Sequence, residues 1–163
     1  RLELFVSGGT CWSDPALLAT QIRLLRDLLP SVKELPLLTW DNAYQASFCE
    51  VKAPYLRVFR CERKNSQTVP CDVFEAAPAL ATIDIWSHDQ TLLDGVALRA
   101  ISAALRRGAL QNLQELNMQN CIVDDGNLRD LMDDLERSGC AARLATLRCA
   151  HWRTFCAKTP FQH

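Results

Sequence analysis

The chain has 163 residues, of which 48% are hydrophobic and 23% are charged, and its formal net charge is −1. This length and composition are typical of one ordinary folded domain. The nearly balanced charge argues against a nucleic-acid partner, and no apolar run is long enough to cross a bilayer, so we expect neither nucleic acid nor membrane as a partner.

The first elements predicted along the chain are a short strand and a helix. Leu2 and Leu4 alternate as in a strand. A helix is expected over 15–29, because Pro15 suits a first helical turn, Pro30 suits a stop, and four apolar residues share one face. These four residues are Leu18, Ile22, Leu25 and Leu29.

An apolar phrase then recurs along the chain. An apolar residue is followed by two free positions, a second apolar residue, one free position and a third apolar residue. The phrase occurs at Val32, Leu35 and Leu37; at Leu56, Phe59 and Cys61; at Leu80, Ile83 and Ile85; at Leu113, Leu116 and Met118; and at Leu144, Leu147 and Cys149. Leu2 and Leu4 fit its second and third places, so the chain begins within a phrase, and we expect a fragment of a longer chain.

Successive phrases start 24, 24, 33 and 31 residues apart, which leaves room for a crossover segment between strands. Two long crossovers have helical apolar spacing, at Val96, Leu98, Ile101 and Leu105 and at Leu128, Leu131 and Leu135. The first ends at Arg106, Arg107 and Gly108 and the second at Arg137, Ser138 and Gly139, with positive charge before a glycine, as helices often do. The short crossovers at 43–52 and 69–77 have room for only one or two turns. This pattern predicts parallel strands joined by helices and stacked as a repeat protein.

The segment 113–122, followed by Asp125, Gly126 and the leucines of the second helix, resembles a leucine-rich repeat of the ribonuclease-inhibitor type. Cys121 stands where that family has Asn or Cys, whereas the other repeats have Trp40, Lys64, His88 and Trp152 there. The 24-residue repeats look more like those of F-box proteins. The resemblance implies an α/β leucine-rich repeat solenoid, a single domain over 1–163 with about six repeats. Its parallel strands would line a curved concave side, with helices of uneven length on the convex side.

The chain has eight cysteines, an even number that leaves a disulfide framework open, but three of them occupy positions where free thiols serve as small apolar groups or weak hydrogen-bond partners. Cys61 and Cys149 occupy inward strand positions, and Cys121 occupies the turn position. We therefore expect free thiols and a reducing, cytoplasmic location.

Neither a metal site nor a catalytic site is expected. Four possible zinc ligands lie near the end of the chain, Cys149, His151, Cys156 and His163, but they form no CxxC pair, and the first two should point apart. The chain has no nucleophile elbow, phosphate loop or paired-histidine motif, which argues against an enzyme and against a cofactor.

An acidic cluster allows two interpretations, a cation site or the anionic first turn and outer face of a helix, and we favour the second. Its members are Asp124, Asp125, Asp130, Asp133, Asp134 and Glu136.

The outward positions of the strands are the best candidates for a binding surface, because the concave side of a solenoid is the usual place for partners. Trp86 beside Asp84, with Arg60 and Glu62 one repeat earlier, is the expected centre, unless the Trp86 ring packs on its neighbours instead. The full predicted set is Phe5, Leu38, Arg60, Glu62, Asp84, Trp86, Asn117, Gln119 and Arg148.

The sequence therefore predicts a protein–protein interaction module without enzymatic activity. Two alternatives stay open. One is the substrate-recognition region of an F-box type ubiquitin ligase subunit, which would need an F-box before residue 1, and the other is a structural subunit of a large assembly.

Overall fold

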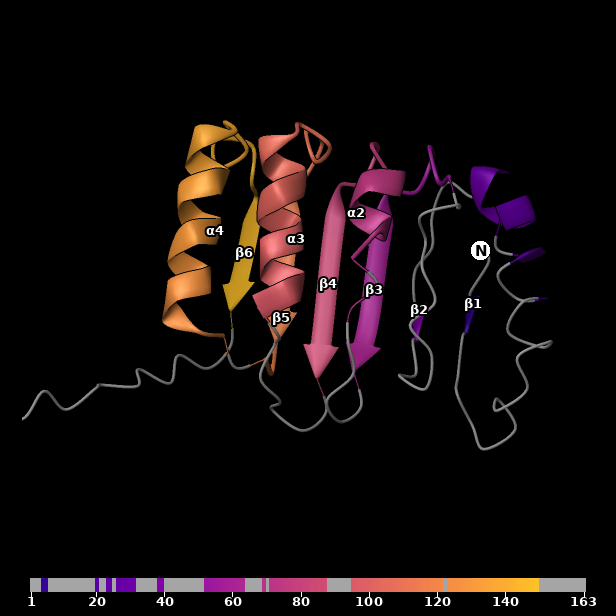
Figure 1. Cartoon of the computed structure of the whole chain (residues 1–163), viewed down its shortest axis with the longest axis horizontal. Coiled ribbons are helices and arrows are strands. Elements are labelled where there is room, and N and C mark those ends of the chain that lie inside the picture. Colours follow the sequence, from indigo (N-terminus) through magenta and orange to yellow (C-terminus); the bar gives the residue numbers. More distant parts are fainter. Residues whose placement is uncertain are drawn as a thin grey trace, which may run out of the picture.

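Six parallel strands form one sheet, and their order in the sheet follows their order in the chain. The structure is a computed structural model that describes residues 4–5, 20, 23–24, 26–31, 38–39, 52–63, 69, 71–87, 95–121 and 123–149. The strands are β1 (Leu4–Phe5), β2 (Leu38–Thr39), β3 (Val58–Arg63), β4 (Thr82–Ser87), β5 (Glu115–Gln119) and β6 (Thr146–Cys149). The α/β class with parallel strands that the sequence predicts is therefore confirmed (Figure 1).

The helices that connect β3 to β6 lie on one face of this sheet (Figure 1). They are α2 (Val73–Ala76), α3 (Gly95–Arg106) and α4 (Asp125–Arg137), and the short 3-10 helix η1 (Leu29–Ser31) precedes β2. The single turn of α2 confirms the prediction for the short crossover at 69–77. Residues 20, 23–24 and 26–28 are helical within the helix predicted over 15–29, whereas 43–51, in the other short crossover, lie outside the described residues.

Local signals set the ends of the two long helices. The Asp124 carboxylate accepts hydrogen bonds from the backbone N–H groups of Gly126 (2.9 Å) and Asn127 (3.2 Å), which caps the start of α4. After α3 and α4 the chain turns through Gly108 (φ 72°) and Gly139 (φ 67°), a left-handed conformation that glycine adopts without a Cβ clash. Both predicted stops are confirmed.

The core lies between the sheet and the helices, where the inward positions of β3, β4 and β5 are buried. The rings of Phe59 on β3 and Phe74 on α2 meet edge to face with centroids 6.0 Å apart. In β6 the pattern weakens, because Leu147 is 38% exposed. The prediction for Val96 is wrong: it is exposed, since a residue two positions before the buried Leu98 falls on the opposite side of a helix.

The strand register confirms most of the predicted alignment. Cys61, Ile85, Met118 and Cys149 are successive partners across β3 to β6. The prediction for Leu38 is wrong, because Leu38 pairs with Cys61 and not with Glu62. The reason is the pair of adjacent leucines at 37 and 38, which fit an inward position equally well, so the apolar pattern alone leaves a one-residue ambiguity.

Candidate protein-binding face

The sheet face away from the helices carries a continuous row of polar side chains. Arg60, Asp84, Asn117 and Arg148 are successive partners on β3, β4, β5 and β6, and we call them the polar row. Because neighbouring strands are about 4.8 Å apart, the row brings together side chains from four segments of the chain. On β3, β4 and β5 the members of the row alternate with buried residues, which places them opposite the core, and Arg148 follows as the register partner of Asn117.

Asp84 is the electrostatic centre of the polar row. Its Oδ2 lies 3.4 Å from the Arg60 Nε, and its side chain is only 23% exposed. Burial raises the pKa of Asp84 above the usual 3.8; the Arg60 guanidinium lowers it, Glu115 raises it and Arg148 lowers it further. The net pKa is raised, so the loss of water around this carboxylate outweighs the two nearby cations.

Asn117 differs from its predicted role as an open contact at the border of the site. It is 8% exposed, and its buried Oδ1 has no hydrogen-bond partner among the residues that the structure describes. The neighbouring strands β4 and β6 flank it on both sides, so its position in the sheet limits its exposure. Asn117 therefore contributes to the inner layer of this face.

The predicted centre at Trp86 stays a prediction. Trp86 is half-buried, which is compatible with both arrangements that the sequence left open, a ring available to a partner and a ring packed on its neighbours. Its strand partners are Glu62 and Gln119, so the structure does bring these three positions together. The side chains of Phe5, Leu38 and Glu62 lie outside the described part of the structure.

Two residues of this face were missing from the predicted set. Thr82 Oγ1 donates a hydrogen bond to Glu115 Oε2 at 3.5 Å across β4 and β5. The negative charge of Glu115 in turn raises the pKa of Asp84. Both residues stand two positions before a member of the polar row. The alternation of the strands was therefore the signal that could have found them.

The cysteines of the described residues are free thiols. The Cys121 thiol donates to the backbone oxygens of Gln119 (3.4 Å) and Ile85 (3.8 Å), so it ties its turn to the neighbouring strand, as expected for the turn position. Within the described ranges no three His, Cys, Asp or Glu residues are placed to hold a metal ion. His151, Cys156 and His163 lie outside those ranges, as do Trp40, Lys64, His88 and Trp152.

The acidic cluster of α4 divides into two kinds of residue. Asp124 caps the helix, as the favoured interpretation predicts. Asp134 does not lie on the outer face: it is 2% exposed, with Arg106 (3.6 Å) and Arg137 (3.7 Å) beside its carboxylate. The packing of α4 against α3 buries this position, which the charge pattern alone could not show.

The site thus offers fixed charges on an ordered sheet surface. No family model matches the sequence, and neither a curated protein nor a solved structure matches it. No helix in the described residues combines the length and apolar character needed to cross a membrane.

Proposed function

We propose that this chain is a leucine-rich repeat solenoid that binds a partner protein on the sheet face away from its helices. The observation that carries the proposal is the polar row, four polar side chains in register on four adjacent strands. No enzymatic reaction and no cofactor form part of the proposal.

The spacing of the strands supports the repeat architecture. Register partners on β3 to β6 are 24, 33 and 31 residues apart, in steps that each contain one strand and one helical crossover. The crossover helix grows from four residues in α2 to 12 in α3 and 13 in α4, in agreement with a mixture of short and long repeats. Each step buries its apolar residues against the next, as repeat proteins do.

The charges of the face support a protein partner. Arg60 and Arg148 are exposed at the two ends of the polar row, and the acids Asp84 and Glu115 lie on the two strands between them. A partner surface with the complementary order of charges would gain specificity from this arrangement. Because strands already hold these groups in place, docking would cost little conformational entropy.

The test is affinity purification with quantitative mass spectrometry on the full chain, comparing the wild type with the double variant Arg60→Ala and Arg148→Ala. Removal of both exposed guanidinium groups should weaken capture of the specific partner by about tenfold or more. The partner found in this way is then titrated against both purified forms.

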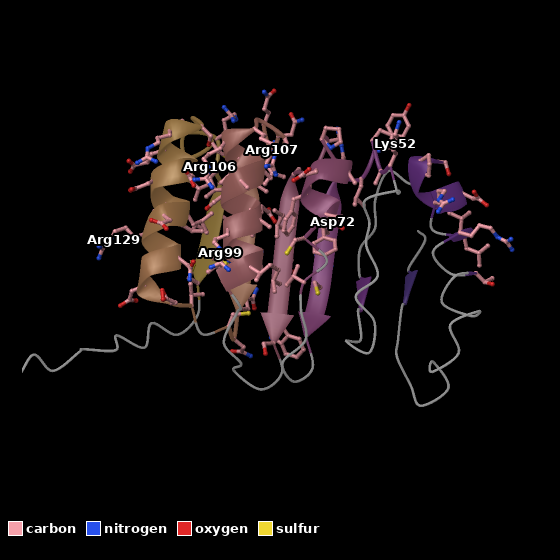
Figure 2. The ribbon with its side chains drawn as sticks, in the orientation of Figure 1. Lys52, Asp72, Arg99, Arg106, Arg107 and Arg129 are labelled. Atoms are coloured by element: carbon pink, nitrogen blue, oxygen red, sulfur yellow. The ribbon has the colours of Figure 1, made fainter. Side chains whose placement is uncertain are left out.

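The matched control is the double variant Arg99→Ala and Arg129→Ala, which removes the same charge from the helix side (Figure 2). This control should bind the partner as the wild type does. Equal loss in both double variants, or no loss in either, would contradict the assignment of the sheet face.

A structural subunit of a larger assembly is a second candidate, favoured by one observation at β6. Leu147 is 38% exposed although its partner Leu116 on β5 is fully buried. Such an apolar side chain on β6, the last strand of the described sheet, suits coverage by another chain. Protection of the β6 amides from hydrogen exchange in the native assembly, but not in the purified chain, would support this role. The F-box hypothesis rests on the 24-residue repeat alone.

A further inference from the structure

A second candidate site lies on the other side of the molecule, where α3 and α4 end. The ends of the two helices and the loops that follow them line a partly open cavity of about 210 Å³. Leu105 and Leu110 give it an apolar wall, and Arg106, Gln111, Ser138 and Arg143 give it polar groups. Figure 2 shows Arg106 at this end of the helices.

The charged residues known to line this cavity have one sign. Two arginines line it, and none of its described lining residues is acidic. Arg106 forms an ion pair with the Asp134 carboxylate, with Nη1 3.6 Å from Oδ2, and its side chain is 59% exposed. Arg143 has no acidic partner among the described residues, and its guanidinium lies against the Cys140 thiol.

The ends of α3 and α4 expose fewer unpaired carbonyl oxygens than helix ends normally do. A helix C-terminus normally presents unpaired carbonyl oxygens, which repel anions. Here loop N–H groups bond several of them: Gly108 and Ala109 donate to carbonyls of α3, and Gly139 and Ala141 donate to carbonyls of α4. Arg106, Gln111 and Arg143 therefore supply the long side chains with N–H donors among the described residues that line the cavity.

The volume limits the size of the ligand. It corresponds to about seven water molecules and is below the roughly 300 Å³ at which pockets for drug-sized ligands begin. An inorganic oxyanion, or one phosphate or carboxylate group of a small metabolite, fits these limits. Guanidinium groups bind such planar or tetrahedral oxyanions through paired N–H donors.

We propose that the cavity at the ends of α3 and α4 binds a small oxyanion, a phosphate or a carboxylate, through Arg106 and Arg143. The site is separate from the polar row and does not depend on the proposed function. Gln111 supplies a further amide donor at the cavity mouth.

The experiment is a thermal-unfolding titration of the full chain with sodium phosphate and, separately, with sodium acetate, at an ionic strength held constant with sodium chloride. At about ten times the dissociation constant, the effective anion should raise Tm by about 3–6 °C. A shift with phosphate alone identifies a phosphate ligand, and a shift with acetate alone identifies a carboxylate ligand. Equal shifts with both support a general oxyanion site.

The decisive variant is Arg143→Ala, which leaves the ion pair of Arg106 with Asp134 intact. It should weaken anion binding by about tenfold. Arg143→Lys should weaken it less, because lysine keeps the positive charge but lacks the paired N–H donors of the guanidinium group. The control Arg129→Ala removes an exposed arginine from α4 that points away from the cavity (Figure 2) and should bind as the wild type does.

A second measurement locates the anion directly. In an amide NMR titration with the same anions, the signals of Gly108 and Ser138 should shift most, because both residues line the cavity. Three outcomes would overturn the proposal: no effect beyond that of chloride, equal weakening in Arg129→Ala and Arg143→Ala, or perturbations centred elsewhere.

Discussion

At the scale of single residues, Asp84 has an environment in which burial and charge oppose each other. Arg60 on one side and Arg148 further along the row favour its ionised form, whereas burial and Glu115 disfavour it. The raised pKa means that the folded chain holds this proton more tightly than the unfolded chain does. Stability is therefore linked to the protonation of this one carboxyl group.

This linkage predicts how the substitution Asp84→Asn changes with pH. The wild type should gain free energy of unfolding relative to the variant as the pH falls through the raised pKa towards 3.8, and lose that gain as the pH rises again. Urea unfolding of both proteins at pH 7 and near pH 4 measures the difference. A difference that stays constant or reverses would show that Asp84 does not titrate as proposed.

At the scale of elements, the start of α4 depends on a single side chain. Asp124 satisfies two backbone donors that the helix itself leaves free, those of Gly126 and Asn127. Such a cap was predictable, because it needs only residues within one turn of each other. The one-residue shift at Leu38 was not, because its correct register depends on pairing with Leu4 and Cys61, which are far away in sequence.

The cap predicts a specific cost. Asp124→Ala should lower the free energy of unfolding by about 1 kcal/mol, while Asp124→Asn, which keeps an acceptor oxygen, should cost much less. The control is Asp130→Ala, an exposed position of the same helix, with an expected change within about 0.5 kcal/mol. Urea unfolding measures all three. Equal losses in Asp124→Ala and Asp130→Ala would rule out the capping role.

At the scale of the whole molecule, the apolar side chains of one step are covered by the next step. Leu116 on β5 has strands on both sides and is fully buried, whereas its register partner Leu147 on β6 has a described neighbour on one side only and is 38% exposed. The two leucines occupy the same position of the repeating phrase. Their different burial therefore arises from their place in the stack.

A pair of substitutions tests this shared coverage. Leu116→Ala should destabilise the protein by about 2–5 kcal/mol, because it leaves a cavity in a close-packed core. Leu147→Ala should cost less than about 1 kcal/mol, because part of that side chain already contacts water. Chemical denaturation followed by circular dichroism gives both values, and similar costs would contradict the stacked arrangement.

The sequence by itself determined the parallel strands, the long helices and their ends, and the positions on β3 to β6 that face away from the core. All of these follow from apolar periodicity and from signals within a few residues. Only the tertiary structure decided the burial of Asn117 and Asp134, the half-buried state of Trp86, the register of Leu38 and the cavity between Arg106 and Arg143. These features depend on side chains that the fold brings together from separate crossovers, and no local pattern records how closely those side chains pack.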